Sequence, residues 1–135
     1  MRSFRSKVRY ALLAAIDLAA RYEREVPVKV EDVARRTGAP AKYLGQILLL
    51  LKAQALVRSS PGPTGGYWLM RRPELISVAE VLGAVAASDK SRGKVPDSPY
   101  DAVLDWLAAE MDEAERRSLS SVSLADLVRR ASGER

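Results

Sequence analysis

Apolar residues recur at helical spacing along the first third of the chain. Three segments show this pattern, at 6–22, 30–37 and about 40–54. Gly38 would end the second segment, and Pro40 would begin the third, because proline is common at the first position of a helix. The predicted apolar face of the first helix consists of Val8, Leu12, Ala15, Ile16 and Ala19. The pattern therefore predicts three helices, the last two joined by a tight turn.

The spacing changes to that of short strands after the third helix. Residues 56–60 and 66–70 are two such runs, and the turn-forming sequence PGPTG stands between them. The sequence SVAE at 77–80 is a capping box, which begins another helix that extends to about residue 87. Helix, turn, helix and hairpin, in this order, form a winged helix-turn-helix.

The remaining residues predict a linker and two more helices. Residues 88–99 are polar and contain prolines and a glycine, so they form a linker or loop. A long helix follows over 99–117 with Ser98 as its cap, and a second capping box at 123–126 begins a final helix. The long helix carries a near-heptad apolar stripe of Tyr100, Val103, Leu104, Leu107, Ala108 and Met111.

We therefore expect a mainly α fold in three parts. Residues 1–87 form a winged helix-turn-helix DNA-binding domain with a two-stranded wing, 88–98 a flexible linker or sensor loop, and 99–135 a long dimerisation helix followed by a C-terminal helix. Since little core remains to cover the stripe, pairing with a second copy explains it better than packing within one chain. A two-fold dimer would present two DNA-binding heads to a palindromic operator.

Composition excludes most enzyme chemistry. The chain of 135 residues has no cysteine and no histidine, so it lacks thiolate nucleophiles, the commonest metal ligand and the usual general base near neutral pH. The glycine-rich loop also lacks the phosphate-binding motif G-x-x-x-x-G-K-[ST], since Tyr67 follows Gly66 where the motif has lysine. We expect a protein that is not an enzyme and has no metal or cofactor. Without a signal-peptide pattern or a membrane-length apolar run, we expect it to be cytoplasmic.

The charge is divided unevenly along the chain. Residues 1–72 contain 14 Lys and Arg against 5 Asp and Glu, a net charge of +9, whereas residues 73–135 contain 8 against 12, a net charge of −4. A basic half joined to an acidic half indicates one part that binds a polyanion and another with a different role. Together with the winged-helix pattern, this charge favours double-stranded DNA as the partner.

The third helix and the wing carry the candidate DNA contacts. Lys42, Tyr43 and Gln46 lie near the start of the third helix, where side chains reach base edges in the major groove. The wing offers side-chain donors, and its glycines permit positive φ and close approach of the backbone to phosphate. The wing candidates are Arg58, Ser59, Ser60, Thr64, Gly65 and Gly66. Candidate phosphate contacts elsewhere are Arg2, Arg5, Lys7, Arg9, Arg35, Arg36 and Lys52.

Five stretches of this sequence match the pattern of a known protein family. They are SKVRYALLAAIDLA at 6–19, VEDVARRTGAPAKYLGQIL at 30–48, LLKAQALVRSSPGPTGGYWL at 50–69, ISVAEVLGAV at 76–85 and VSLADLV at 122–128. In these stretches the chain resembles the iron–sulfur cluster regulator (IscR)-type family of bacterial winged-helix transcription factors. The resemblance implies a homodimer in which the long helix of each subunit packs against the other subunit. It also implies promoter binding, usually for repression.

Three departures from the family pattern bear on function. Family members that sense iron–sulfur status have three cysteines in the segment that corresponds to 88–99, with a further ligand just beyond, whereas here Ser98 and Asp101 stand near two of these positions. A cluster held in the family's manner is therefore excluded. Gly45 stands where the best-known members have a glutamate that contacts a base, and Pro61 where the wing often has arginine. We therefore expect an operator that differs from the family's usual one.

The sequence thus predicts a homodimeric transcription factor, a repressor, that binds a palindromic operator without a cluster. Residues 88–99 could bind a small effector or a protein partner, or could be the remnant of a lost cluster site. Trp68 and Trp106 are interpreted as structural side chains rather than ligand-binding ones. The alternative is a winged helix that serves protein assembly, with its acidic second half docking a partner and without salt-dependent affinity for DNA.

Overall fold

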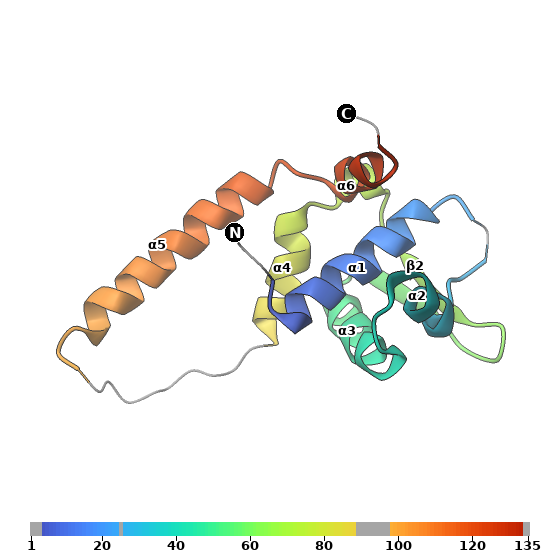
Figure 1. The fold of residues 1–135 in the computed structure, drawn as a ribbon, viewed down its shortest axis with the longest axis horizontal. Coiled ribbons are helices and arrows are strands. Elements are labelled where there is room, and N and C mark those ends of the chain that lie inside the picture. The colour runs from blue at the N-terminus through green and yellow to red at the C-terminus, as the bar shows by residue number, and fades with distance from the viewer. Residues whose placement is uncertain (1–3, 25, 89–97, 134–135) are drawn as a thin grey trace.

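The computed structural model describes residues 4–24, 26–88 and 98–133 of the chain. In chain order, its elements are α1 (Ser6–Ala20), α2 (Val30–Thr37), α3 (Ala41–Ala53), β1 (Val57–Ser60), β2 (Gly66–Leu69), the short 3-10 helix η1 (Pro73–Leu75), α4 (Val78–Ala87), α5 (Asp101–Leu119) and α6 (Leu124–Ala131). The hairpin and all α-helices except α5 pack into one body, and α5 extends to one side of it (Figure 1). The mainly α winged helix-turn-helix with an additional long helix is therefore confirmed.

α1 is the central helix of the body. It contacts α2, α3, α4 and α6, so it is covered on several sides rather than along one stripe. Its buried apolar residues are Ala11, Ala14, Ala15, Leu18 and Ala19. Of the predicted apolar face, Ala15 and Ala19 are buried, and Val8 and Leu12 are partly buried and pack against this core. Ile16 is partly buried. The small alanine side chains allow the neighbouring helices to approach α1 closely.

A tight turn joins α2 to α3. Gly38 has a φ of 79°, in the left-handed region that favours glycine, and its N–H donates to the carbonyl of Ala34 to close α2. The first helical residue of α3 is Ala41. Pro40 is therefore the N-cap residue that precedes the helix, and not its first helical residue as predicted.

The wing is an antiparallel hairpin of β1 and β2. Its register pairs Val57 with Leu69 and Arg58 with Trp68. Directly paired residues point to the same face of a sheet. Val57 and Leu69 are buried against the body, so Arg58 and Trp68 lie on the opposite, outer face of the wing. The two predicted strands are confirmed, each one residue shorter than expected.

Capping boxes begin α4 and α6, as the sequence predicts. The hydroxyl of Ser77 accepts from the N–H of Glu80, and the carboxylate of Glu80 accepts from the N–H of Ser77. Ser123 and Asp126 make the same reciprocal pair at the start of α6. These contacts satisfy N–H groups that a helix start otherwise leaves without partners.

The segments that precede α4 and α6 also pair with each other. The N–H of Val78 donates to the carbonyl of Val122 at 2.8 Å, and the N–H of Leu124 donates to the carbonyl of Ile76 at 2.9 Å. Leu124 is fully buried, and α6 packs against α1 and η1. The sequence grouped this last helix with the long helix in region 99–135, whereas its contacts tie it to the winged-helix body.

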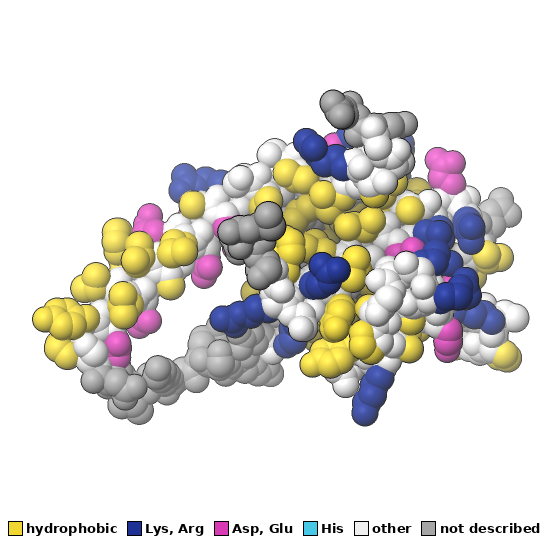
Figure 2. Space-filling view, viewed as in Figure 1, with side chains coloured by type: hydrophobic (Ala, Val, Ile, Leu, Met, Phe, Trp, Pro, Cys, Tyr) yellow, Lys and Arg dark blue, Asp and Glu magenta, His cyan; other side chains and the backbone are white. Residues whose placement is uncertain are grey.

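α5 contributes nothing to the core. None of the residues from Asp101 to Leu119, all of which the structure describes, is buried. The helix begins two residues later than predicted, because Pro99 and Tyr100 form the turn before it, and it also ends two residues later. Apolar side chains follow its length in Figure 2. The large side chains of the predicted stripe are between 46% and 71% exposed.

Candidate nucleic-acid interface

α3 presents a polar face beside its apolar one. The apolar face consists of Leu44, Ile47, Leu48 and Leu51, all of which are buried. The side chains of Lys42, Tyr43 and Gln46 are exposed on the first turns of the helix. This is the part of a recognition helix from which side chains reach base edges. The three predicted base readers are therefore accessible together on one helix.

Tyr43 is positioned by the start of α1. Its ring packs on that of Tyr10, with ring centroids 5.4 Å apart and planes inclined at 56°. An aromatic pair of this geometry is attractive beyond its burial of surface. The contact brings the basic first turns of α1 beside the first turn of α3, so Arg9 next to Tyr10 is exposed near the candidate readers.

Of the other basic residues predicted near the N-terminus, Arg5 is exposed and Lys7 extends toward α4. The ammonium group of Lys7 donates to the hydroxyl of Ser88 at 3.4 Å. Arg2 lies outside the described residues. Lys7 precedes Tyr10 by about one helical turn, and Tyr10 packs on Tyr43, so this basic segment lies near the start of α3.

A hydrogen bond connects the end of α3 to the wing. The ammonium group of Lys52 donates to the hydroxyl of Ser59 at 2.8 Å. This contact joins two residues that the sequence predicts to meet DNA, one on the helix and one on β1. Ser60 follows in a half-buried position, and Thr64 is exposed in the loop between the strands. The wing is therefore held beside α3.

Arg58 lies along the outer face of the wing. The central carbon of its guanidinium group is 3.9 Å from the centroid of the Trp68 ring, which is a cation–π contact. The register pairs these two residues near the base of the hairpin, two positions before the pair of Ser60 and Gly66 next to the loop. Any contact of Arg58 with phosphate would therefore be made from the outer face and not from the tip.

The wing loop needs glycine for two different reasons. Gly62 has a φ of 92°, so the predicted positive φ is confirmed there. A Cβ on Gly65 would lie 2.0 Å from the carbonyl oxygen of Ser60, so the closely folded loop itself excludes a side chain at this position.

Gly66 allows the wing to contact the connection between α1 and α2. A Cβ on Gly66 would lie 2.3 Å from the carbonyl oxygen of Val28. Val28 and Tyr67 pair as in a sheet, through hydrogen bonds of 2.9 and 2.8 Å between their backbones. The sequence pattern did not predict this bridge, which fixes the wing against the start of α2.

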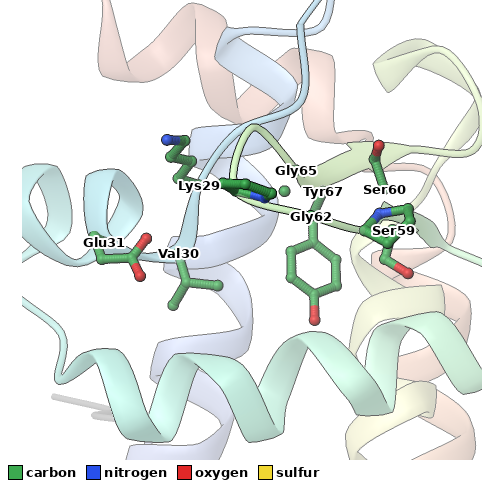
Figure 3. Close-up of a pocket in the computed structure, with 11 residues that line it drawn as sticks. Lys29, Val30, Glu31, Ser59, Ser60, Gly62, Gly65 and Tyr67 are labelled. Carbon is green, nitrogen blue, oxygen red and sulfur yellow. The ribbon is translucent and has the colours of Figure 1, made fainter.

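An open hollow of about 680 Å³ lies between the wing and the start of α2. Figure 3 shows Lys29 and Glu31 on the α2 side and Ser59 and Gly62 on the wing side. Lys29 is exposed, so it adds a cation beside the wing that the sequence analysis did not select. No local signal could have identified it, because its place depends on the backbone bridge between distant segments.

A buried carboxylate holds Arg36. Asp17 is only 7% exposed and accepts hydrogen bonds from Arg36 at 2.9 and 2.8 Å and from Arg21 at 2.9 Å. The hydrogen bond to Asp17 raises the pKa of Arg36, although burial opposes this shift. Arg36 therefore ties α2 to α1 and points its charge into the body. Arg35, by contrast, is exposed and forms a surface pair with Asp32 at 2.9 Å.

The predicted effector segment 88–99 lies largely outside the described residues. At its far end, the hydroxyl of Ser98 accepts from the N–H of Tyr100 at 3.1 Å. The carboxylate of Asp101 accepts from the N–H of Ser98 at 3.1 Å. Ser98 and Asp101, which stand near ligand positions of the cluster-binding pattern, thus serve here to order the turn that begins α5.

Residues 4–24, 26–88 and 98–133 contain neither a metal-binding cluster nor a membrane-spanning helix. In these ranges no three carboxylate, cysteine or histidine side chains are grouped so that they could hold a metal ion. The same ranges contain no helix with both the length and the apolar character needed to span a bilayer.

Comparison with known families identifies the chain. The Rrf2 family model, described as "Iron-dependent Transcriptional regulator", matches residues 4–130. The chain belongs to the Rrf2 family. The HTH-type transcriptional regulator IscR of Xenorhabdus nematophila is 38% identical over 128 residues, which cover 92% of this chain and 77% of that protein.

Two solved structures are similar to this chain in fold. T. potens IscR has a TM-score of 0.70 and 30% identity, over 96% of this chain and 88% of that chain. CymR, the global cysteine regulator of B. subtilis, has a TM-score of 0.70 and 26% identity, over 95% and 97% respectively. The present chain is therefore a member of a transcriptional regulator family with a DNA-binding winged helix.

The description of the Rrf2 family names iron, but the donor set of this member does not fit a thiolate-held cluster. Iron–sulfur clusters in proteins are bound by cysteine thiolates, with histidine replacing some of them in certain centres. This sequence contains neither residue, and the side chains of Ser98 and Asp101 are engaged at the start of α5. No part of the function is therefore derived from a cluster.

Proposed function

We propose that this Rrf2 protein is a sequence-specific DNA-binding transcriptional regulator, a repressor that binds a palindromic operator as a homodimer without an iron–sulfur cluster. The observation that carries the proposal is the exposed polar face of α3, with Lys42, Tyr43 and Gln46 on its first turns and a buried apolar face behind them. A helix of this kind beside a wing can enter the major groove while the wing follows the backbone.

The proposed contacts divide into base readers and phosphate contacts. Lys42 and Gln46 can donate to base edges, and glutamine can bridge an adenine. Tyr43, held by Tyr10, can contact a base methyl or the sugar–phosphate backbone. The proposed phosphate contacts are Arg2, Arg5, Lys7, Arg9, Lys29, Arg35, Lys52, Arg58, Ser59, Ser60, Thr64 and the backbone of Gly65 and Gly66. Arg36 is left out because its guanidinium group binds Asp17.

The exposed stripe of α5 supports the homodimer. In proteins, most of the stability of a helix comes from packing of its apolar face, so the exposed stripe of α5 needs a cover. A second copy brings an identical stripe, and two-fold pairing also matches two recognition helices to two half-sites. The division of the chain into a body that binds DNA and a helix that pairs subunits follows from the same proposal.

The absence of enzymatic activity and the location in the cell also follow from this proposal. The relatives are named transcriptional regulators rather than enzymes, and the composition lacks the usual catalytic residues, so we infer a protein without enzymatic activity. A regulator that acts on a bacterial promoter works in the cytoplasm, where the chromosome lies.

Titration of the purified protein against its own upstream DNA and against random DNA, each at two salt concentrations, tests the proposal. We expect a gap in affinity between the two DNAs and a steep loss of affinity with salt. Lys42→Ala should reduce the difference in binding free energy between the two DNAs by about 1–3 kcal/mol. Arg58→Ala should weaken binding to both DNAs alike and reduce the salt slope by about one.

Two results would contradict the proposal. If Lys42→Ala lost the same affinity for specific DNA as for random DNA, Lys42 would not be a base reader. Binding that is absent, or that shows no dependence on salt, would favour the alternative of a winged helix for protein assembly. Repression itself is tested by transcription from the bound promoter in vitro, where added protein should lower transcript yield.

A further inference from the structure

A second hollow, of about 480 Å³, lies between the end of α1 and the base of the wing. Arg21, Tyr22 and Arg24 line it from the α1 side. Arg58 and Trp68 line it from the outer face of the hairpin, together with Met70 beyond β2. Among the described residues, its lining shares only Tyr67 with that of the hollow in Figure 3. This surface is therefore separate from the proposed DNA interface except at Arg58.

The charged side chains that line this second hollow are all positive. Its lining includes three arginines, at 21, 24 and 58, and no acidic residue among those that the structure describes. Arg24 has no ion pair within the described part of the chain. Arg21 shares the carboxylate of Asp17 with Arg36, so that single charge is divided between two cations. The hollow is thus electropositive and suited to an anion.

One donor in the lining lacks an acceptor. The Nε atom of Arg21 is buried and has no hydrogen-bond partner in the described structure, while its Nη1 atom donates to Asp17. A buried donor without a partner costs free energy. Because the Nε atom of Arg21 has almost no accessible surface, the exposed guanidinium groups of Arg24 and Arg58 offer the direct contacts to an anion in the hollow. Carboxylates and phosphates accept from guanidinium groups strongly.

The same hollow exposes aromatic and apolar surface. Tyr22 is 37% exposed and Met70 is 48% exposed, although both are large side chains next to a concave surface. Trp68 is half-buried and carries the guanidinium group of Arg58 against its ring. Planar rings stack on tryptophan, tyrosine and guanidinium planes, and methionine contacts aromatic rings favourably.

We propose that the hollow lined by Arg21, Tyr22, Arg24, Arg58, Trp68 and Met70 binds a small molecule that carries a carboxylate or phosphate on an aromatic ring. The arginines bind the anionic group, and the ring lies against Tyr22, Met70 and the stacked pair of Arg58 and Trp68. Its volume of about 480 Å³ lies within the usual range of small-molecule sites, about 300–1,000 Å³.

A ligand bound in this hollow would affect the proposed DNA-binding elements through two connections. Arg21 is linked through Asp17 to Arg36 on α2, and Arg58 stands on a strand of the wing. An anion beside Arg58 lowers the positive potential of the wing, so ligand binding weakens DNA binding. This consequence rests on the proposed function, whereas binding of the ligand does not.

The binding test uses the full chain with Trp106→Phe, which leaves Trp68 as the single tryptophan. Naphthoate and naphthyl phosphate are the anionic probes, and their relative affinities identify which anionic group the site prefers. We expect a saturable change in Trp68 emission with at least one of them. The neutral naphthamide and inorganic phosphate should each bind at least about tenfold more weakly, since each lacks one half of the recognised chemistry.

Variants locate the binding. Arg24→Ala and Tyr22→Leu should each weaken binding about tenfold, because one removes a cation and the other an aromatic surface. Arg72→Ala is the matched control, since it removes the charge of an exposed arginine that pairs with Glu74 and does not line the hollow. No saturable response to either anionic probe, equal binding of naphthamide, or unchanged binding by Arg24→Ala would overturn the proposal.

A DNA titration separates this inference from the proposed function. Without ligand, Arg24→Ala should bind DNA as the parent does, and it should lose the weakening that naphthoate or naphthyl phosphate produces. If Arg24→Ala alone weakens DNA binding, the hollow is part of the DNA interface and the ligand site is refuted. If the parent does not bind DNA at all, the proposed function fails while the emission data still decide on the ligand site.

Discussion

Gly45 stands inside α3 at a position where a helix favours almost any other residue. Apart from its two chain neighbours and the backbone of its own helix, no described atom lies within 4 Å of the place where its Cβ would be, and its φ is not in the left-handed region. Neither packing nor backbone conformation therefore requires glycine here, which distinguishes it from Gly65 and Gly66 in the wing. Its effect falls instead on the surface of the recognition helix, where it removes a side chain between the candidate readers.

Gly45→Ala should stabilise the protein. Alanine costs less conformational entropy in a helix, so we expect the free energy of unfolding to rise by up to about 1 kcal/mol. Urea denaturation followed by circular dichroism measures the change. A loss of stability would show that the open space beside Gly45 is filled in solution.

Arg36 and Arg35 are neighbours with opposite surroundings. Arg36→Ala leaves the buried carboxylate of Asp17 with Arg21 alone, and we expect the free energy of unfolding to fall by about 2–3 kcal/mol. Arg35→Ala removes only an exposed pair with Asp32, which should cost less than about 1 kcal/mol. Parallel denaturant titrations compare the two variants, and equal losses would contradict a structural role specific to Arg36.

At the scale of elements, the starts of α4 and α6 are held by carboxylates with lowered pKa values. Burial acts to raise the pKa of Glu80, but hydrogen bonds from Arg71 and Ser77 outweigh it and lower the pKa. The pKa of Asp126 is lowered first by the hydrogen bond from the backbone of Ser123. Since both helices begin where their two segments pair, these caps also support the contact of α6 with the body.

A pKa that is lower in the folded state than in the unfolded state makes the free energy of unfolding depend on pH. The unfolded chain binds these protons more readily, so the stabilisation is complete above the ordinary carboxyl pKa of about 4 and is lost as the pH falls through the lower folded values. We expect the free energy of unfolding to decline on acidification from about pH 5 to about pH 3. Glu80→Gln should make this decline smaller, and an identical pH profile in the variant would exclude Glu80 as a contributor.

At the scale of the whole molecule, α5 is the element that the single chain leaves unexplained. It is a long helix without a buried residue, and it carries Leu104, Leu107 and Met111 in exposed positions on one face. The body carries the proposed DNA-binding surface, and α5 extends away from it in Figure 1. In the proposed homodimer, this separation allows subunit pairing and DNA binding to use different surfaces.

Leu104→Arg should convert the proposed homodimer to a monomer. A charged side chain in the centre of the stripe would be buried without a partner, and Leu104 makes no contribution to the core of its own chain. Ala109→Arg is the matched control, because Ala109 lies on the opposite face of the helix and is exposed. Sedimentation gives the mass of each variant, and an unchanged mass for Leu104→Arg would exclude the stripe as the dimer interface.

The sequence by itself determined those features that depend on neighbouring residues. Apolar periodicity, Gly38 at the turn, and the capping boxes at Ser77 and Ser123 are local signals, so the helices and the order of the winged helix could be predicted. The exposure of the candidate readers on α3 could be predicted in the same way, because the sequence of a helix with one apolar face also shows which residues lie on its other face.

Only the tertiary structure decided what distant residues do to one another. It paired Arg36, a predicted phosphate contact, with Asp17, and it placed Arg58 against Trp68 on the outer face of the wing. It also placed α6 on the body and gathered three arginines beside Tyr22 in one hollow. These contacts join segments far apart in the chain, and their existence depends on packing geometry that no local pattern encodes.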